Sequence, residues 1–539
     1  MIKVEYGIVT TGAKDKFAPQ LENCALISNA DDLSKENLVF KNFGNPCEEY
    51  SVLLDGGSIA IPENTSSENI GVWSKNISNE KGEFENEFPT ITLTSSELFD
   101  IDGLSLIFDT QNNIYATKFS IFWYKDDELI TTKEYEPVSP SFSLTEDIIS
   151  TNKIVIVFKA INTPSSRLKV RSVVYGSILI IEGKSIKNMR IHQEVSVISN
   201  TIPISTLDLT FLNADNTNYN FTARQSLKVF NNDVIIGKYF IENAKQVNNL
   251  QWNIEAQDYI NTLEIVEFEG EIYVDELAHN IITTIFNKAN VPFTLAMELY
   301  DVRVTGYIPY TTCRKALQQV LFAIGAYAST SYSENVDILL NDLTTQESIG
   351  LERILTGQTI SVDADITEIE LVAHNYIPLE ETIILYQSNN VEENLKIIFS
   401  EPVYELIIEN GEIVESGTNY AIINCGENTI LKGKKFEHST FSKTKRNTTT
   451  SNKTINKKTI KNATLISSSN IDNILNVCYN YLVKNSSVKS KIIEGSTPIV
   501  VGKTYEVETN LLGKVTGTLT EQDFSIYGGN KIVKETVIR

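Results

Sequence analysis

Short runs of β-branched and aromatic residues recur along the whole chain, and most end at Asn, Asp, Gly or Ser. Such runs are typical of strands, because branched and aromatic side chains pack well on a pleated sheet and the four closing residues favour turns. Examples are residues 104–108, 119–124, 153–158, 177–182 and 234–241. The chain is therefore predicted to be mainly β, built as blocks of short strands that pack into sandwiches or barrels.

Helical periodicity, with apolar residues every three or four positions, is confined to a few stretches. They are residues 275–289, 312–328 and 468–484. Thr311 or Thr312 is placed to cap the second helix, and Ser469 or Asn470 is placed to cap the third. Each apolar stripe fits the core face of a helix that packs on a sheet. The predicted fold class is thus a β-rich α+β protein with few helices.

Composition excludes several classes of protein. The chain has 539 residues and a formal net charge of −23, and such an acidic surface repels phosphate, so sequence-specific nucleic-acid binding is not expected. No apolar run reaches the roughly 18 residues that a membrane-spanning helix needs, so no membrane span is expected. The residues after Met1 lack the pattern of a secretory signal.

The cysteines indicate a chain that folds in a reducing compartment. Cys24, Cys47, Cys313, Cys425 and Cys478 are odd in number, and no two of them form a CxxC pair. A disulfide framework needs paired cysteines at regular spacing, so these residues are predicted to be reduced thiols in the core.

Residues that could carry chemistry are few. The four histidines, His192, His279, His374 and His438, show no metal-ligand spacing, and no phosphate-binding glycine loop or nucleophile motif occurs. The segment that begins at Asp363 lacks the glycine and the final glutamate of a calcium loop, so it is interpreted as a turn. We therefore predict no catalytic residues, no cofactor and no metal ligands, and the sequence assigns no ligand-binding residues.

The N-terminal third resembles a known kind of module. Residues 48–57 (EEYSVLLDGG), followed by Gly71-Val-Trp73-Ser, look like the opening of prophage tail proteins of low-GC Gram-positive bacteria. From there to Gly176 the order of strands is similar to a galactose-binding-like module. Its marks are residues 91–94, 101–108, 116–124 and 168–175. The resemblance implies a jelly roll.

The middle of the chain resembles the first barrel of baseplate hub proteins. The strands at residues 204–211, 225–230 and 235–240 are followed by an A-x-D-x-x-x-x-L segment that begins at Ala256 and contains Asp258. Arg314, Ala316 and Leu317 match the Arg-x-Ala-Leu helix of the same family. The carboxy-terminal part is also similar to that family, in residues 462–484, 501–507 and 513–529. It departs from the family pattern by an inserted residue at Glu521.

The resemblance implies a structural virion protein, the baseplate hub of a phage tail or contractile tail-like particle, assembled in the host cytoplasm. Hub proteins of this kind form a homotrimer whose six barrels match a six-fold tail tube. The implied partners are other copies of the chain, the tail tube, other baseplate and tip proteins and the tape-measure protein.

The same resemblance implies an order of domains. It comprises an N-terminal segment expected to be a docking arm (1–48), a galactose-binding-like jelly roll (49–184), a first hub β-barrel (185–270), an α/β insertion (271–345) and a second hub β-barrel (346–539).

Two other functions are alternatives to the hub. A tail adhesin would bind cell-wall glycan through the jelly roll, with Trp73, Trp123 or Tyr124 stacking on sugar rings. However, Phe119, Ile121 and Trp123 alternate along one strand, which predicts that this face is core. A tail-associated wall hydrolase is the third alternative, and no residue set for acid, base and nucleophile supports it.

Residues 432–461 stand out by charge. They hold nine lysines, Arg446 and one acid, Glu437, so this stretch carries +9 and leaves −32 for the rest of a chain of −23. One interpretation is a mobile, solvated loop. The other is that residues 432–436 and 460–465 continue strands while the middle lies against an acidic neighbour, another copy or an adjoining tail protein. The residues expected to make that contact are Lys443, Lys445, Arg446, Lys457 and Lys458.

Overall fold

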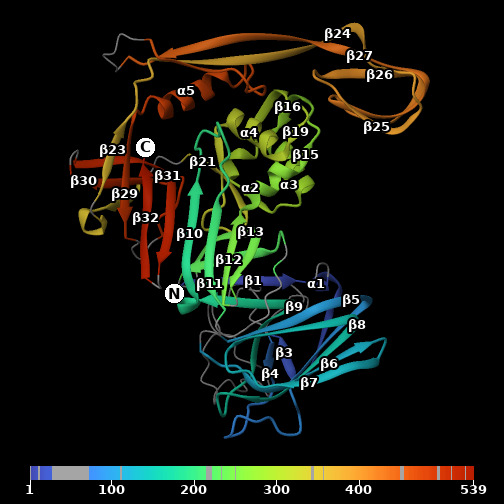
Figure 1. Cartoon of the computed structure of the whole chain (residues 1–539), viewed down its shortest axis with the longest axis vertical. Helices are drawn as coiled ribbons and strands as arrows, with labels where there is room; N and C mark the ends of the chain where they lie inside the picture. Colours follow the sequence, from blue (N-terminus) through green and yellow to red (C-terminus); the bar gives the residue numbers. More distant parts are fainter. Residues whose placement is uncertain are drawn as a thin grey trace, which may run out of the picture. The chain divides into compact units, whose positions relative to one another are not determined.

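The computed structural model describes most of the chain. The described residues are 2–9, 13–26, 72–109, 112–213, 221, 223–231, 234–248, 250–341, 345–355, 357–448, 455–493, 498–510, 513–527 and 530–538. The chain divides into two compact units, one formed by Glu5–Ile180 and the other by Met1–Val4 with Ile181–Arg539. Figure 1 labels the elements of both units. No described helix has the length and apolar character needed to cross a membrane.

The smaller unit is a two-layered β-sandwich around a single core. One layer runs in the order β2 (Ala18–Glu22), β5 (Thr90–Phe108), β8 (Ser141–Ile161), β6 (Ala116–Lys125) and β7 (Glu128–Tyr135). The other contains β3 (Cys24–Leu26), β4 (Val72–Ser74) and β9 (Lys169–Glu182), and a short helix, α1, spans Ala13–Lys16. The long strands β5 and β8 pass from one layer into the other, and bulges between Thr94 and Gly103 turn β5 between them.

Residues 18–26 belong to this sandwich. Each residue from Ala18 to Glu22 pairs with β5, and Cys24–Leu26 pair with β4. Residues 18–26 of the expected docking arm (1–48) are thus strands of the sandwich, and the docking role of the segment stays a prediction. Residues 27–71, including the motif at 48–57, lie outside the described residues.

The larger unit is built on one continuous sheet whose strands come from both predicted barrels. β10 (Ile186–Glu194) pairs along seven residues with β31 (Gly513–Tyr527), from Asn188 opposite Tyr527 to Glu194 opposite Glu521. We call this pairing the seam. On one side of the seam lie β11 (Thr206–Leu212), β14 (Gln251–Gln257), β13 (Val234–Asn248), β12 (Ser226–Asn231) and β1 (Ile2–Val9). On the other lie β32 (Asn530–Ile538), β29 (Ser486–Ile492) and β23 (Thr359–Val362). β30 (Thr504–Thr509) also pairs with β31, and β22 (Thr345–Ile349) pairs with β30.

The predicted helices are present in the larger unit. They are α3 (Ala278–Ala289), α4 (Cys313–Ile324) and α5 (Ile471–Leu482). The Thr312 side chain caps α4 by accepting a hydrogen bond from the Lys315 N–H. Asn470 holds the cap position of α5, but its amide donates instead to the carbonyls of Ala323 and Leu465. A fourth helix, α2 (Tyr259–Ile265), was not predicted because it has only seven residues.

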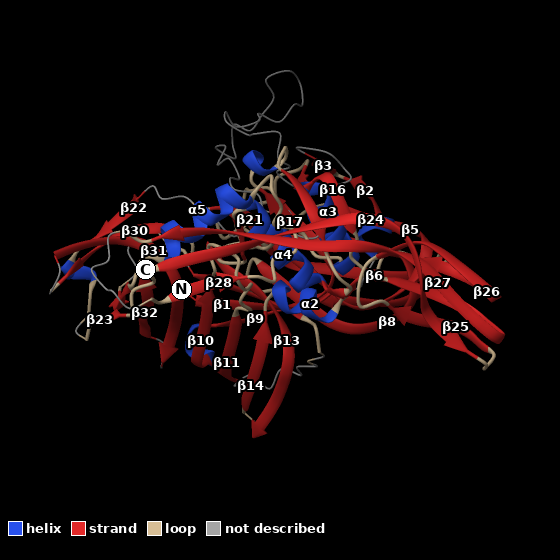
Figure 2. Cartoon of the chain, turned by 90° about the horizontal axis from the view of Figure 1, so that it is seen from above, coloured by secondary structure: helices blue, strands red, loops and turns tan. Residues whose placement is uncertain are grey.

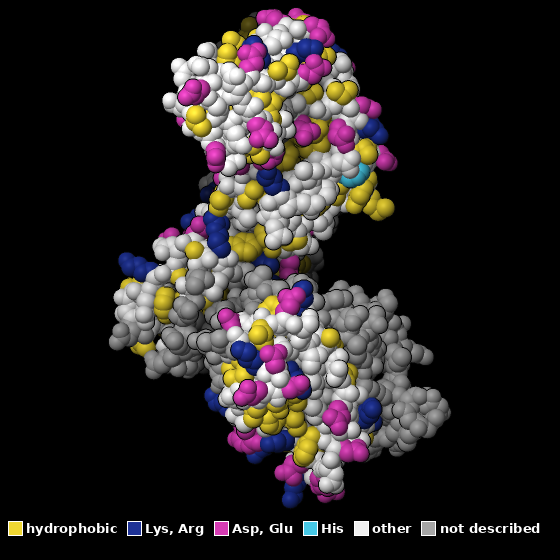
Figure 3. Space-filling view, turned by 90° about the vertical axis from the view of Figure 1, so that its right-hand side faces the viewer, with side chains coloured by type: hydrophobic (Ala, Val, Ile, Leu, Met, Phe, Trp, Pro, Cys, Tyr) yellow, Lys and Arg dark blue, Asp and Glu magenta, His cyan; other side chains and the backbone are white. Residues whose placement is uncertain are grey.

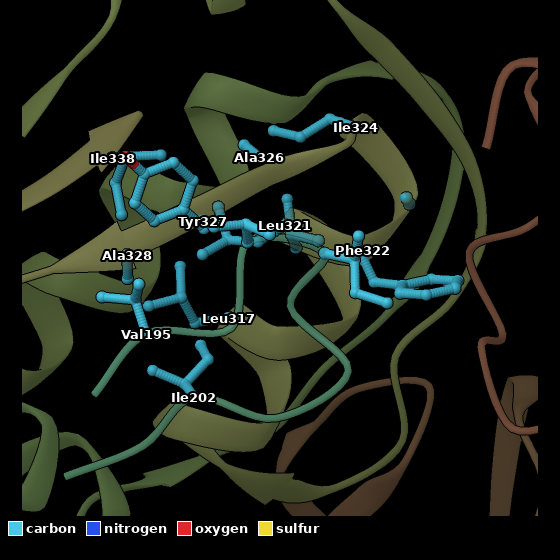
Figure 4. Close-up of a cluster of buried hydrophobic side chains, with 14 of the residues drawn as sticks. Val195, Ile202, Leu317, Leu321, Phe322, Ile324, Ala326, Tyr327, Ala328 and Ile338 are labelled. Atoms are coloured by element: carbon cyan, nitrogen blue, oxygen red, sulfur yellow. The ribbon is translucent and has the colours of Figure 1, made fainter. Parts of the chain in front are cut away.

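These helices and three small sheets form the main core. Leu317 and Leu321 of α4 face Val195, Ile202, Tyr327 and Ile338 (Figure 4). The small sheets pair β15 (Glu267–Phe268) with β19 (Thr311–Thr312), β16 (Ile272–Leu277) with β18 (Arg303–Tyr307), and β21 (Val336–Leu340) with β17 (Phe293–Leu295) and β20 (Ala326–Ser329). Each helix buries one apolar face in this core, and this is why its periodicity was visible in the sequence.

A long five-stranded sheet completes the larger unit, and we call it the arm. It consists of β24 (Glu368–Ser388), β25 (Glu392–Ile398), β26 (Val403–Ser416), β27 (Tyr420–Arg446) and β28 (Lys457–Ile460). Figure 2 shows β24 and β27 running as a long ribbon toward β25 and β26. That end has its own small core, which includes Val403, Ile423 and Leu431.

Candidate functional site

The basic stretch is ordered strand over most of its length. Residues 432–446 lie in β27 and residues 457–460 in β28, so the prediction of a mobile loop is wrong for both. The expected strand at residues 432–436 is confirmed, whereas the expected strand at 460–465 ends at Ile460. Residues 449–454 lie outside the described residues.

The acidic partner of the basic stretch is the chain itself. Cross-strand carboxylates of the arm and an aspartate of α5 lie within ion-pair distance of its positive groups. The pairs are Lys432–Glu409 at 2.5 Å, Lys434–Glu405 at 2.7 Å, Lys435–Glu381 at 2.6 Å, Lys443–Asp472 at 2.8 Å, Arg446–Glu368 at 3.2 Å and Lys457–Glu370 at 3.0 Å. Lys445 reaches Asn476 at 2.7 Å and lies 4.2 Å above the Tyr479 ring, while the Lys458 side chain is exposed. These pairs all lie within one chain, and the contact with an acidic neighbour stays a prediction.

The surface of the arm is consequently mixed in charge. In Figure 3, acidic and basic side chains are interspersed over the upper part of the view. Exposed pairs of this kind each stabilise by about 0–1 kcal/mol, so their main effect is to fix the register of β24 against β27.

The aromatic residues considered for glycan stacking are mostly core. Trp73 and Trp123 are fully buried, as are Phe119 and Ile121, which confirms the core face predicted from their alternation. Tyr124 alone of the three candidates is partly exposed, and Lys153 lies 5.2 Å from its ring centroid. A sugar platform built on Trp73 or Trp123 is therefore wrong, because neither ring reaches the surface.

The cysteines within the described residues are buried thiols without disulfides, as predicted. These are Cys24, Cys313, Cys425 and Cys478, and Cys47 lies outside the described residues. Burial raises the pKa of Cys24 and Cys478 to about 12 and that of Cys313 to about 11. Thiols held protonated in this way are poor nucleophiles.

The seam carries a charged cluster on its outer face. His192 Nδ1 lies 3.1 Å from Asp523 Oδ1, His192 Nε2 lies 3.8 Å from Glu194, and Arg190 donates to Asp523 at 3.0 Å. His192, Asp523 and Glu521 lie close enough to share a metal ion. Since Arg190 already neutralises Asp523, we assign no ion to this cluster.

The cluster should make stability depend on pH. The Glu194 carboxylate, aided by Asp523 and Glu521, raises the pKa of His192 in spite of partial burial. The charged imidazole therefore stabilises the fold fully below its unfolded pKa of about 6.5, and this contribution is lost as the pH rises through the folded pKa. In His192→Gln the melting temperature should fall relative to wild type at pH 6 and differ less at pH 9. The distant His279→Gln serves as control, and an equal loss at both pH values would refute the role of the charge.

A buried polar cluster lies on the core side of the same seam. Gln522 Nε2 donates to Gln193 Oε1 at 2.6 Å, and Ser331 Oγ donates to the same oxygen at 2.9 Å. Gln193 in turn donates to the Ile236 carbonyl at 3.0 Å. The cluster thus ties β10, β31 and β13 together. Gln522 stood within the family-like carboxy-terminal pattern, but no sequence signal indicated Gln193 or Ser331.

The inserted residue at Glu521 has a structural counterpart. The register of β31 against β32 shifts between Leu519 and Glu521, which is a β-bulge. A bulge absorbs one extra residue without breaking the ladder. The seven pairs of the seam continue from Glu521 in unbroken register.

A cavity of about 440 Å³ lies where the arm meets α5 and β18. It is lined by Thr305, His374, Asn375, Ser439, Thr440, Phe441 and Ser467–Ser469. His374 is the only ionisable side chain in this lining, and both of its ring nitrogens already have hydrogen-bond partners. The hydroxyls of the cavity are therefore without a free base that could activate them.

Comparisons with known proteins are informative only at the level of structure. No protein-family model matches the chain, and no curated protein matches it. The chain is similar to a tail protein from Neisseria meningitidis, at 10% identity and a TM-score of 0.43, over 66% of this chain and 92% of that one. It is similar to a tail protein of prophage MuSo2 from Shewanella oneidensis, at 8% identity and a TM-score of 0.42, over 67% and 95%. A prophage tail protein from Listeria monocytogenes matches at 9% identity and a TM-score of 0.40, over 68% and 92%. At such identities no residue's role is carried over.

Proposed function

We propose that the chain is a structural protein of a phage tail or contractile tail-like particle, the baseplate hub that joins the tail tube to the tip. The observation that carries this proposal is the seam, because it joins strands of the two predicted barrels, residues 185–270 and 346–539, in one sheet. Backbone hydrogen bonds on both sides of each inner strand make such a wall rigid without any ligand. A protein that transmits force between neighbouring tail proteins needs a rigid sheet of this kind.

The side chains of the larger unit support a structural role over a catalytic one. His374 is already engaged by two partners, His192 is held by carboxylates, and the described thiols are buried. None of these groups is poised as a base or nucleophile beside a cavity. The hub is proposed to act in the virion with the tail tube, the tip and the tape-measure protein as partners.

The sandwich is proposed to be a peripheral module of the galactose-binding-like type. The core of the sandwich is formed within the smaller unit, so the sandwich should not be needed for assembly of the trimer. With Trp73 and Trp123 buried, Tyr124 is the one of the three candidate residues that is accessible for stacking on a sugar.

The oligomeric state tests the proposal. The purified chain should form a trimer of about 181 kDa, three times 60.4 kDa, in size-exclusion chromatography with light scattering. A variant in which a short Gly/Ser linker joins Val4 to Ile181 lacks the sandwich and should still be trimeric. A monomer at micromolar concentration that also fails to bind purified tail tubes would refute the hub. A truncated chain that folds as a monomer would refute only the peripheral position of the sandwich.

A further inference from the structure

Two histidines that are 64 positions apart in the sequence meet at the root of the arm. His374 on β24 is only 7% exposed, and its Nε2 lies 3.0 Å from the carbonyl oxygen of Lys461. A carbonyl can only accept a hydrogen bond, so the His374 proton resides on Nε2. In the neutral ring Nδ1 is then an unprotonated acceptor.

The second histidine supplies the donor. His438 Nε2, on β27, lies 2.9 Å from His374 Nδ1. The two ring centroids are 5.1 Å apart and the ring planes differ by 11°, so the rings lie edge to edge in nearly one plane. This is the geometry of a direct imidazole–imidazole hydrogen bond, in which His438 Nε2–H donates to His374 Nδ1. His438 is exposed, and its ring stacks on Tyr376 at 4.5 Å.

The pair connects the arm to the rest of the larger unit. Lys461 follows β28, and the backbone N–H of His374 donates to the Ile466 carbonyl in the segment that leads to α5. Tyr376 contacts the ring of Tyr307 on β18 at 5.3 Å. The Tyr307 hydroxyl donates to the Asn419 side chain, which immediately precedes β27. Loss of the histidine bond would therefore loosen the arm at its root.

Each proton has a different effect on the pair. A proton on His438 leaves the bond intact, because its Nε2–H can still donate to His374 Nδ1. The second must bind His374 at Nδ1, and this removes the only acceptor between the rings. Two N–H groups and two positive charges would then face each other at 2.9 Å.

The surroundings oppose the second proton. Burial, aided by the neighbouring His438, lowers the pKa of His374, and the Lys461 carbonyl acts against this shift only in part. Most of the charged and titratable groups nearby are engaged elsewhere. On β27, Lys435 pairs with Glu381 and Lys443 with Asp472 of α5, while Glu437 is exposed beside His438. On β24, Glu370 pairs with Lys457 of β28. Between β25 and β26, Glu401 acts on the hydroxyls of Tyr376 and Tyr307.

We propose that the His374–His438 pair is a pH-sensitive lock that holds the root of the arm at neutral pH and releases it when both rings are charged. Because His374 resists protonation in the folded state, stability at the root falls as the pH drops below the ordinary histidine range. The released element is the ladder of β24 and β27, next to the cavity described above.

Hydrogen exchange of the full chain, corrected for the intrinsic pH dependence of amide exchange, tests the lock. Protection of residues 374–378 and 436–440 should fall by up to about tenfold per pH unit below the second protonation, because one proton is coupled to the opening. Protection in the sandwich and along the seam should change less. A uniform loss over the whole chain would overturn the proposal, since it would indicate general acid unfolding.

His438→Gln is the decisive variant. The glutamine amide can still donate to His374 Nδ1 but cannot take up a proton, so the root should stay protected to a lower pH than in wild type. His374→Gln should weaken protection at the root already at pH 7.5, and His279→Gln should match wild type. If His438→Gln shows the wild-type pH profile, the pair is a structural contact and no lock.

Discussion

Trp123→Ala should lower the free energy of unfolding of the sandwich by about 3–5 kcal/mol, the usual cost of removing a fully buried large aromatic side chain. Trp123 is completely buried on β6, opposite Ile154 of β8 and Thr131 of β7. The cavity left by the indole cannot collapse easily, because both neighbouring strands are held by ladder hydrogen bonds. Differential scanning calorimetry should show the sandwich transition shifted down and the transition of the larger unit unchanged.

Tyr124→Ala is the matched control for Trp123→Ala. Tyr124 is the next residue of the same strand, points to the opposite face and is only partly buried. Its contact with Lys153 accounts for about 0.5–1 kcal/mol, so the calorimetric shift should be small. A stable Trp123→Ala protein with reduced glycan binding would contradict the core assignment and restore the adhesin alternative.

Local features of the fold were predictable from the sequence. The strands at residues 119–124 and 153–158 and the helices α3, α4 and α5 follow from periodicity, because one face of each is buried. The cap at Thr312 was equally readable, since its hydrogen bond spans only three residues.

Features that depend on distant pairing were not predictable. The seam joins residues more than 300 positions apart, such as His192 and Asp523, and a single sequence contains no signal of which strands become neighbours. For the same reason, the His374–His438 pair was not predictable from the sequence. Each histidine looked isolated, and only the register of β24 against β27 places the two rings together.

The strands of the basic stretch were not predicted for a different reason. Its Lys and Thr residues lack the apolar alternation of a half-buried strand, because part of the ribbon of β24 and β27 is exposed on both faces. The glutamates that pair with it lie mostly on β24 and β26, up to 89 residues earlier. Charge complementarity between strands can replace burial as the source of register, but it becomes visible only after the strands are aligned.

Asp258→Ala should lower the free energy of unfolding of the larger unit by about 3–5 kcal/mol. Asp258 is 1% exposed, and its carboxylate accepts hydrogen bonds from the Thr330 hydroxyl at 2.7 Å and from the N–H groups of Ser205 and Ile260 at 3.1 Å. Alanine leaves these three donors without an acceptor in the core and removes the N-cap of α2. The aspartate of the A-x-D segment thus starts α2, a helix that is too short to show periodicity in the sequence.

Asp208→Ala provides the control for Asp258→Ala, since Asp208 lies in the same unit but on the exposed face of β11. It should change stability by no more than about 0.5 kcal/mol. The calorimetric pattern should be the reverse of that for Trp123→Ala, with the larger unit shifted and the sandwich unchanged. If Asp258→Ala moved both transitions together, the two units would not unfold independently, and the proposal that the sandwich is a peripheral module would fail with it.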